Sequence, residues 1–562
     1  MSTIYNKLSE ERKSLVAEGN CPEWFSTAGY QMFKEKYLYQ ATHPKEQYER
    51  IARTLAAHTP DPNAWKEKFF KLLWTGWLSP STPVLANCGT TRGLPVSCAG
   101  TYIGDDLDSI YKGKHEVAML TKAGFGTASY LGDIRSRGAS ISVGGKSSGL
   151  MPIIEGFQSD MEYVSQGTAR RGSWAGYLPI DHGDFDEVCN YLSHHPDGNN
   201  IGWNITEEFI DRLTSGDDDA KVRYAKALKT KMVTGKGYFF FVDKANAKRP
   251  QMYVDKGLDI KSSQLCNEIM LHSSEDYTYT CVLSSMNLAK WDEWKNTDAI
   301  FEATVFLDAV CQEFIERGKN LPGLEKAIAF TRKSRALGLG VCGFHTYLQK
   351  NLMPFEGFEA HQWNTQVFSK LSSESLRASQ WLASVWGEPE WCKGYGLANT
   401  HRLAVAPTKS TALIMGGISE GINPDTAMVF TQRTPAGEID RVNPVLLQIM
   451  KDKGVYNQKN VEDIRSAMGS VQQVDWLDDN EKLAFRTAFE INQDAVLRLA
   501  SVRGNYLDQW QSLNLFFAAG EDASYINEIH KKAFLDPNIL GLYYIYSKAG
   551  VQASKDECMA CM

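Results

Sequence analysis

The sequence lacks the features that mark a secreted, membrane-bound or polymer-binding protein. Its first ten residues, MSTIYNKLSE, are polar, and no apolar run approaches the length of a membrane span. The formal charge of −7 provides no excess of basic residues for a nucleic-acid polymer. No repeat of fixed period and no low-complexity segment is present. These absences predict a cytoplasmic protein that contacts neither membrane nor nucleic-acid polymer.

What is present is a large chain with enough apolar residues for a sizeable core. The 562 residues are 43% hydrophobic and 11% aromatic, which suits a large enzyme barrel with appendages. The 11 cysteines are poor candidates for structural disulfides in such a compartment, so we sort them by site. Cys98, Cys266 and Cys281 lie in short ordered motifs, whereas Cys558 and Cys561 lie in the tail.

The order of predicted elements indicates an α/β fold. Residues 1–78 are predicted to be helical, because their apolar residues recur at helical spacing. From residue 79 onward, short apolar strands alternate with helical stretches, which implies a mostly parallel sheet covered on both faces or closed into a barrel. The clearest strands are 237–242, 281–288, 403–406 and 540–545, and the clearest helices are 46–58, 65–78, 205–213, 301–317, 366–386 and 479–499. The more polar segment 435–475 predicts a small separate unit.

Two features near the C-terminus suggest redox chemistry. Tyr543 and Tyr544 are adjacent, and neighbouring phenols can pass an oxidising equivalent from one to the other. Cys558 and Cys561 form a Cys-x-x-Cys motif, which can carry reducing equivalents to another site. Taken alone, a Tyr-Tyr pair inside ILGLYYI is more often strand core, and tail cysteines are often metal ligands. Other parts of the chain must decide between these interpretations.

The segment SQLCNEI (263–269) places an amide, a thiol and a carboxylate at alternate positions. If the segment is extended, Gln264, Cys266 and Glu268 point to one face. A thiol can lose a hydrogen atom to become a thiyl radical, and a carboxylate can take a proton from a substrate hydroxyl. Cys98 and Cys281 lie on other short apolar segments, and facing each other they could deliver two electrons by forming a disulfide. A buried cysteine in a strand is more often simply core.

Together these motifs resemble the large, catalytic subunit of class I ribonucleotide reductases. The matching stretches are SPSTPVLAN (79–87), SC (97–98), GDDLDSI (104–110), LCNEI (265–269), CVLS (281–284), APTKST (406–411) and LYY (542–544). The resemblance implies a ten-stranded α/β barrel of two five-stranded parallel halves over residues 79–550. It also implies an N-terminal helical region over 1–78 without an ATP-cone, and a flexible redox tail over 551–562.

The resemblance implies a role for each motif residue in reducing ribonucleotides, expected to be ribonucleoside diphosphates, to 2′-deoxyribonucleotides. Cys266 is expected to be the thiyl-radical site and Glu268 the general base on the 3′-hydroxyl. Gln264 stands where the family usually has asparagine. Cys98 and Cys281 are expected to be the reducing pair that ends each turnover as a disulfide.

The resemblance also implies partners. Tyr543 and Tyr544 are expected to relay a radical from a separate, metal-containing small subunit, so that this chain binds no metal or cofactor itself. Cys558 and Cys561 are expected to reduce the active-site disulfide and to be recharged by a thioredoxin or glutaredoxin. About ten residues separate position 551 from Cys561, which allows the tail to span roughly 33 Å.

Two further groups of residues are expected to bind nucleotides. Substrate binding is expected at Thr82, Ser97, Lys409, Ser410 and Thr411, the last three in a loop that opens a helix; an ordinary helix cap is the other interpretation. An allosteric deoxynucleotide or ATP is expected at the interface of a homodimer. Asp105 is expected to hold its sugar, Arg135 its phosphates, and the loop SQGTARRGSWAG (165–176) to link it to base choice. The alternative for these loops is a solvated, Gly-rich surface.

Three alternatives remain at this stage. A cobalamin-dependent reductase of the same barrel type generates its radical locally and needs no tyrosine pair. A catalytically silent nucleotide-binding regulator has no need of the three barrel cysteines and Glu268, which argues against it. A zinc-binding interaction protein built around the tail cysteines is the third, although two cysteines supply only half of a tetrahedral site.

Overall fold

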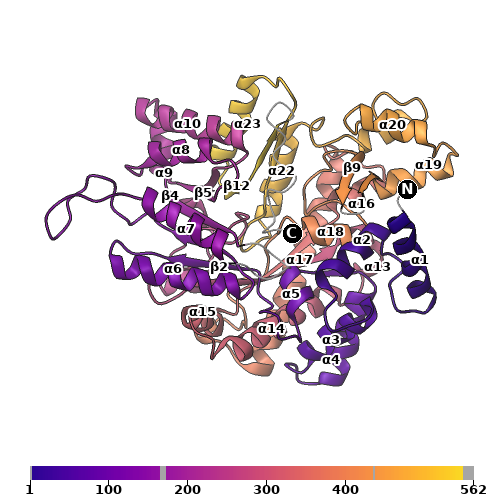
Figure 1. Ribbon diagram of the computed structural model, residues 1–562, viewed down its shortest axis with the longest axis horizontal. Coiled ribbons are helices and arrows are strands. Elements are labelled where there is room, and N and C mark those ends of the chain that lie inside the picture. The colour runs from indigo at the N-terminus through magenta and orange to yellow at the C-terminus, as the bar shows by residue number, and fades with distance from the viewer. Residues whose placement is uncertain (1–2, 165–171, 435–436, 548–562) are drawn as a thin grey trace.

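The protein is described here by a computed structural model, which covers residues 3–164, 172–434 and 437–547 (Figure 1). The N-terminal part is helical, as predicted. Its helices are α1 (Thr3–Ala17), α2 (Thr27–Met32), the π-helix η1 (Phe33–Tyr37), α3 (Pro44–Ala56) and α4 (Pro62–Trp74). Both α3 and α4 begin with a proline, and the side chains of His43 and Asp61 accept hydrogen bonds from the first turn.

A nine-stranded sheet forms the centre of the molecule. Its order is β1-β7-β2-β3-β4-β5-β6-β12, with β8 paired to β7. The strands are β1 (Leu78–Pro80), β2 (Cys98–Tyr102), β3 (Gly126–Tyr130), β4 (Trp174–Pro179), β5 (Asn200–Ile205), β6 (Tyr238–Phe241), β7 (Tyr279–Asn287), β8 (Leu337–Cys342) and β12 (Gly541–Leu542). Strands β2 to β6 run parallel, whereas β7 is antiparallel to both β1 and β2.

Helices connect the parallel strands and cover them. They are α6 (Leu107–Lys122), α7 (Met151–Tyr163), α8 (Phe185–His194), α9 (Glu207–Ser215) and α10 (Asp218–Thr234). Figure 1 shows these helices on the opposite side of the molecule from the N-terminal helices. Because strands covered in this way are buried on both faces, nearly all residues of β2 to β6 are buried. The predicted α/β class is confirmed.

Beyond β8 the parallel pairing continues through single bridges. Leu339 pairs with Leu403, Val405 pairs with Gln511, and β11 (Leu515–Phe517) runs parallel to β13 (Ile545–Ser547). The strand predicted at 403–406 is therefore present only as bridges. The strand predicted at 540–545 is wrong, because the chain leaves β12 after Leu542 and joins a different sheet at β13.

Long helices pack around this second part of the molecule. They are α14 (Ala299–Gly318), α15 (Glu325–Ser334), α17 (Phe358–Trp386), α22 (Gln493–Gly504) and α23 (Ala523–Leu535). The single helix predicted at 479–499 is wrong. The chain forms α21 (Asp479–Ala484) and then α22, because Asn492 caps a new helix by accepting a hydrogen bond from the Asp494 N–H. The remaining short helices are α5 (Thr82–Asn87), α11 (Val242–Ala247), α12 (Gln251–Asp255), η2 (Leu288–Lys290), α13 (Trp291–Trp294), α16 (Phe344–Lys350), η3 (Glu390–Cys392) and α18 (Lys409–Ile414).

A second, smaller hydrophobic core supports the predicted separate unit. Its buried residues extend from Met428 to Phe485, so the unit is longer than the predicted 435–475. It contains the hairpin of β9 (Val429–Thr434) and β10 (Gly437–Val442), followed by α19 (Pro444–Asp452), α20 (Gln458–Ser466) and α21. The core therefore explains why a polar segment still folds at this position.

Candidate active site

Cys98 and Cys281 are opposite each other across two paired strands. Cys98 begins β2, Cys281 lies in β7, and the two are partners in the antiparallel register. Opposed residues in an antiparallel pair have Cα atoms about 4.5–5.5 Å apart, which lies inside the range of roughly 4.4–6.8 Å found for disulfides. Both side chains are buried and reduced. The structure thus brings the predicted reducing pair together.

Cys266 lies on a loop that enters the same region. The extended conformation considered for Gln264, Cys266 and Glu268 is wrong, because the chain turns between Gln264 and Asn267. Asn267 adopts a left-handed conformation with φ of 62°, and its Nδ2 donates to the carbonyl of Phe239 at 3.1 Å. A turn of this kind projects the Cys266 thiol from a loop tip rather than from one face of a strand.

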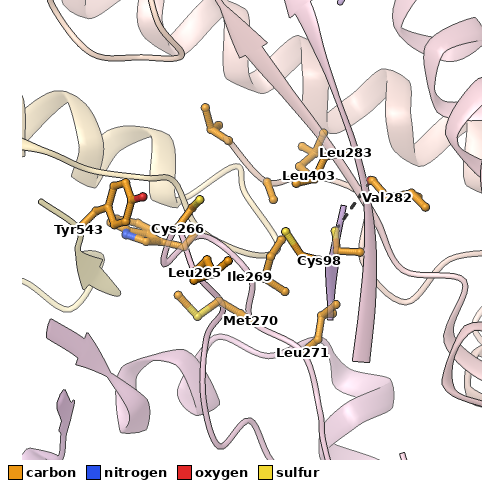
Figure 2. Close-up of a cluster of buried hydrophobic side chains, with 14 of the residues drawn as sticks. Cys98, Leu265, Cys266, Ile269, Met270, Leu271, Val282, Leu283, Leu403 and Tyr543 are labelled. Atoms are coloured by element: carbon orange, nitrogen blue, oxygen red, sulfur yellow. Dashed lines mark hydrogen bonds between the residues drawn. The ribbon is translucent and has the colours of Figure 1, made fainter. Parts of the chain in front are cut away.

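The side chain of Gln264 connects the loop with the cysteine pair. Its Oε1 accepts hydrogen bonds from the N–H groups of Cys266 and Asn267, the latter at 2.8 Å. Its Nε2 lies 3.7 Å from the Sγ atom of Cys98. Figure 2 shows Cys266 between Cys98 and Tyr543. The amide at this position therefore orders the backbone of the loop against β2.

Glu268 is completely buried next to Cys266. The hydroxyl of Ser512 lies 3.1 Å from the Glu268 carboxylate and 2.7 Å from the Cys266 carbonyl. The backbone N–H of Trp510 donates to the Glu268 carbonyl at 2.9 Å. These contacts fix the carboxylate on the same loop as the Cys266 thiol, with Ser512 bound to both residues, which suits a base that works together with a radical site.

Burial controls the protonation of Cys281. Its side chain is fully enclosed, and this desolvation, together with Cys98 and Glu268 nearby, holds the pKa of the Cys281 thiol well above its usual value. Cys281 therefore keeps its proton at neutral pH. A thiol that is protonated at rest can supply a proton as well as an electron to a substrate.

Tyr543 and Tyr544 lie in the break between β12 and β13. Their ring centroids are 4.1 Å apart, with an angle of 47° between the ring planes. Tyr543 is buried, whereas Tyr544 is only partly buried, so the pair leads from the interior toward the surface. A third tyrosine, Tyr238 of β6, contacts both rings and donates a hydrogen bond of 3.3 Å to the Tyr544 hydroxyl. The tyrosine pair is thus not ordinary strand core.

The predicted substrate-binding residues lie at the beginnings of two short helices and next to β2. Thr82 opens α5, and its hydroxyl lies 3.2 Å from the Tyr37 hydroxyl. Ser97 donates to the hydroxyl of Ser81 at 3.0 Å. Lys409, Ser410 and Thr411 form the first turn of α18, after a left-handed Thr408. The hydroxyl of Ser410 is buried with no hydrogen-bond partner among the described residues.

The two predicted effector residues bind each other. Arg135 Nε lies 2.6 Å from a carboxylate oxygen of Asp105, and the Arg135 N–H donates to the other oxygen at 3.0 Å. Both side chains are partly exposed, so the ion pair is accessible. Cys558 and Cys561 lie outside the described residues, as do positions 165–171 of the predicted effector loop.

Three residues that shape the site were not predicted: Tyr177, Asn267 and Ser512. The Tyr177 hydroxyl donates to the Gln264 carbonyl at 2.6 Å, and so holds the loop from β4. Asparagine is enriched among left-handed residues, so the turn at Asn267 had a weak local signal. Tyr177 and Ser512 come from distant elements, and nothing near them in the sequence indicates the contact.

No described helix combines the length and apolar character needed to cross a membrane. Among residues 3–164, 172–434 and 437–547, no group of three or more His, Cys, Asp or Glu side chains is arranged to hold a metal ion.

Two protein-family models match most of the chain. The ribonucleotide reductase barrel domain matches residues 96–220, 218–391 and 389–545, and the ribonucleotide reductase all-alpha domain matches residues 23–93. The chain belongs to the ribonucleotide reductase large-subunit family. The resemblance drawn from the sequence motifs is therefore confirmed, and so is an all-alpha domain ahead of the barrel domain.

Individual relatives agree with this family. A Frog virus 3 (isolate Goorha) protein bearing the name of a ribonucleoside-diphosphate reductase large subunit is 33% identical, over 88% of this chain and 92% of its own length. The ribonucleoside-diphosphate reductase large subunit of Invertebrate iridescent virus 3 is 28% identical, over 93% of this chain and 94% of its own length.

A solved structure narrows the family to class I. The class Id ribonucleotide reductase alpha subunit of Actinobacillus ureae superposes with a TM-score of 0.86 at 37% identity, over 94% of this chain and 98% of its own. This ribonucleotide reductase large subunit is thus a class I member. The cobalamin-dependent, silent-regulator and zinc-protein alternatives gain no support from these relatives.

Proposed function

We propose that this ribonucleotide reductase large subunit reduces ribonucleoside diphosphates to 2′-deoxyribonucleoside diphosphates for DNA synthesis. The observation that carries the proposal is the Gln264 amide, which joins the loop of Cys266 and Glu268 to Cys98, the strand partner of Cys281; Figure 2 shows Tyr543 on the other side of Cys266. The diphosphate substrate class is the one in the names of its relatives. A cytoplasmic location, where thiols stay reduced, is part of the same proposal.

The proposed reaction assigns one step to each group. A Cys266 thiyl radical takes the hydrogen atom from C3′ of the ribose, while Glu268 accepts the proton of the 3′-hydroxyl. The 2′-hydroxyl then leaves as water with a proton from the thiol pair. Cys98 and Cys281 supply two electrons and two protons in total and end as a disulfide. The second thiol hydrogen is added at C2′, Glu268 returns its proton to the 3′-oxygen, and Cys266 returns the hydrogen atom to C3′. The nucleotide thus loses one oxygen as water, and the thiol pair is oxidised.

The radical is proposed to reach Cys266 through Tyr544 and then Tyr543. The partly buried position of Tyr544 suits contact with a metal-containing small subunit, and the enclosed position of Tyr543 suits delivery to the loop. A closed site protects a thiyl radical from water and stray reductants. In this proposal the small subunit supplies the radical, and the large subunit holds no metal or cofactor of its own.

Reduction of the Cys98–Cys281 disulfide is assigned to Cys558 and Cys561. Exchange with a dithiol transfers two electrons and regenerates both thiols. A thioredoxin or glutaredoxin is then the external reductant in this proposal.

The substrate diphosphate is proposed to bind at the first turn of α18, with Thr82 and Ser97 nearby. Backbone N–H groups at such a turn suit phosphate oxygens, and the buried Ser410 hydroxyl supports a donor role there. Lys409 adds a positive charge to the loop. Thr411 completes the turn.

Allosteric control is proposed at the Asp105–Arg135 pair. A deoxynucleoside triphosphate or ATP that bound there would separate the pair, with Asp105 holding the sugar and Arg135 the phosphates. A homodimer is part of the proposal, because Leu107 and Tyr111 of α6 and Tyr163 of α7 are exposed on two helices that contact each other.

The barrel is proposed to be ten-stranded, with two five-stranded parallel halves over residues 79–550. The parallel run β2 to β6 supports one half. The line of parallel pairings from β7 and β8 through Leu403, Gln511 and β13 supports the other. The helical region 1–78 and the redox tail 551–562 complete the proposed domains.

A mixing assay tests the proposed function. The chain, a class I small subunit, a dithiol and CDP should yield dCDP, and Cys266→Ser should yield none. Cys189→Ala, which changes a buried cysteine of α8, is the matched control and should retain activity. Activity without any small subunit after addition of adenosylcobalamin would contradict the class I proposal, and full activity of Cys266→Ser would contradict the thiyl mechanism.

A further inference from the structure

The peptide that joins Tyr543 to Tyr544 lies in a break between two sheets. β12 ends at Leu542 and pairs with β6, whereas β13 begins at Ile545 and pairs with β11. Neither strand ladder includes the Tyr543 carbonyl or the Tyr544 N–H. Because buried backbone groups without partners cost folding free energy, other groups must satisfy this peptide.

Two side chains hold the peptide, one at each end. The Lys231 ammonium, from α10, donates to the Tyr543 carbonyl and lies 3.5 Å from the Leu542 carbonyl. The Tyr544 N–H donates to Oδ1 of Asn514 at 3.1 Å. We call Lys231 and Asn514 the peptide clamp. The groups on either side of the peptide keep strand-like pairing, since the Tyr543 N–H donates to the Leu513 carbonyl at 2.8 Å and the Leu515 N–H donates to the Tyr544 carbonyl at 3.1 Å. The clamp binds the two groups in between.

Burial of Lys231 at this position carries a large desolvation penalty. Lys231 is completely buried, and the structure gives it no ion pair with any described residue. Its Nζ lies 5.7 Å from the ring centroids of Tyr238 and Phe239, and burial lowers its pKa well below the usual value. A methionine of similar length avoids this desolvation penalty. It also removes the donor to the Tyr543 carbonyl, so the two effects on stability oppose each other and stability alone gives little preference for lysine here.

We propose that Lys231 and Asn514 are positioning residues that set the relative orientation of the Tyr543 and Tyr544 rings for radical transfer. The inference rests on the proposed relay function of these tyrosines. Rotation of their shared peptide changes ψ of Tyr543 and φ of Tyr544, and so changes the direction in which each side chain leaves the backbone. The clamp blocks that rotation and keeps the ring centroids 4.1 Å apart.

Kinetics of the full chain with its small subunit test the clamp. Lys231→Met should lower kcat at least about tenfold and leave KM for CDP unchanged, because the substrate site is intact while the relay geometry is not. Its thermal midpoint should change little, because loss of the lysine's desolvation penalty offsets loss of the donor to the Tyr543 carbonyl. Lys231→Arg, which keeps a donor, should recover part of kcat. Asn514→Ala should also lower kcat, and the double variant should be no slower than the slower single variant, since both act on one peptide.

Lys244 provides the matched control. It is a second buried lysine, and it donates to the carbonyls of Ala533, Phe534 and Asp536 at the end of α23, with its Nζ 4.2 Å from the ring centroid of Phe241. Lys244→Met removes a comparable charge without touching the tyrosine peptide. It should leave kcat unchanged, whatever it does to the thermal midpoint.

Hydrogen exchange provides a readout that does not need turnover. Lys231→Met and Asn514→Ala should speed amide exchange in the 541–547 segment, and Lys244→Met should not. Unchanged kcat and unchanged exchange in both clamp variants would overturn the clamp, even where Tyr543→Phe is inactive and the relay stands. An active Tyr543→Phe variant would overturn the relay and, with it, the proposal. Faster exchange in the Lys231 and Asn514 variants would then show only that these two side chains hold the peptide. If Lys231→Met does not fold, the kcat and amide exchange of Lys231→Arg and Asn514→Ala test the proposal instead.

Discussion

The Nε2 atom of Gln264 lies 3.7 Å from the Sγ atom of Cys98, while Oε1 of the same side chain accepts the N–H groups of Cys266 and Asn267. One amide thus joins the proposed radical site to the proposed reducing pair. The family usually has asparagine here, and the longer glutamine reaches both partners in this chain.

Gln264→Ala should lower both activity and stability. The substitution removes the Oε1 acceptor of the buried Cys266 N–H, at a cost of about 1–3 kcal/mol, whereas the Asn267 N–H keeps its 3.2 Å bond to the backbone carbonyl of residue 264. The loop that carries Cys266 then shifts, so kcat should fall roughly 100-fold. Steady-state dCDP formation and thermal unfolding measure the two effects.

Gln264→Asn and Gln493→Ala are the controls for this prediction. Gln264→Asn keeps an amide but shortens it by one methylene, so its kcat should lie between wild type and Gln264→Ala. Gln493 is equally buried and accepts the Phe516 N–H at 2.9 Å, far from the cysteines in the chain. Gln493→Ala should destabilise the fold with little loss of kcat; an equal loss in both alanine variants would contradict a special role for Gln264.

Gly541→Ala should disturb the Cys266 loop from outside it. A Cβ atom at Gly541 would lie 2.5 Å from Nδ2 of Asn267, which is itself held by the Phe239 carbonyl. Overpacking of this kind costs about 1–3 kcal/mol and displaces the neighbour. The midpoint of thermal unfolding and kcat should both fall. Gly520→Ala meets no atom within 4 Å but strains a backbone with φ of 76°, so it should lower stability while its kcat stays at the wild-type value. Normal kcat for Gly541→Ala would show that the loop adapts.

Thiol counting tests the reducing pair. After one turnover with CDP, small subunit and no external reductant, the wild-type chain truncated before Cys558 should lose two titratable thiols. Cys281→Ser in the same background should lose none, because the disulfide cannot form between Cys98 and serine. Loss of two thiols in this variant would place the disulfide elsewhere.

The alkylation rate of Cys281 should depend steeply on pH. Only the thiolate reacts, and a raised pKa keeps Cys281 protonated at neutral pH. Its rate with iodoacetamide should therefore rise about tenfold per pH unit through pH 9, whereas the rate of an unburied thiol, with a pKa of ~8.5, already levels off at that pH. Mass spectrometry of the Cys281 peptide measures the rate. A plateau below pH 8 would contradict the raised pKa.

Lys409→Ala should raise KM for CDP a few-fold and leave kcat near wild type. Lys409 contributes charge attraction to a partly exposed site, where one charge pair is worth about 0.2–1 kcal/mol. The effect should shrink at high salt because ions screen the attraction. Lys350→Ala, in another short helix, is the control and should not change KM. An unchanged KM for Lys409→Ala would remove the residue from the phosphate site.

Local sequence was enough to identify the chemistry of this protein. Amide, thiol and carboxylate at 264, 266 and 268, the tyrosine pair, and the alternation of strands with helices all depend on residues close together in the chain. Helices such as α3 and α14 were predictable because apolar spacing and prolines act over a few residues. These features led to the correct family and the α/β class.

Tertiary structure alone decided how the groups meet. The turn at Asn267 replaced the expected extended segment because Phe239 and Tyr177 satisfy its side chain from distant positions, in addition to the local bond from its N–H to Gln264. The break at Tyr543 likewise depends on Lys231, which is 312 residues away in the chain from Tyr543, and on Asn514, which is 30 residues away from Tyr544. Hydrogen bonds between remote elements leave no periodic trace in the sequence, so only the folded chain reveals them.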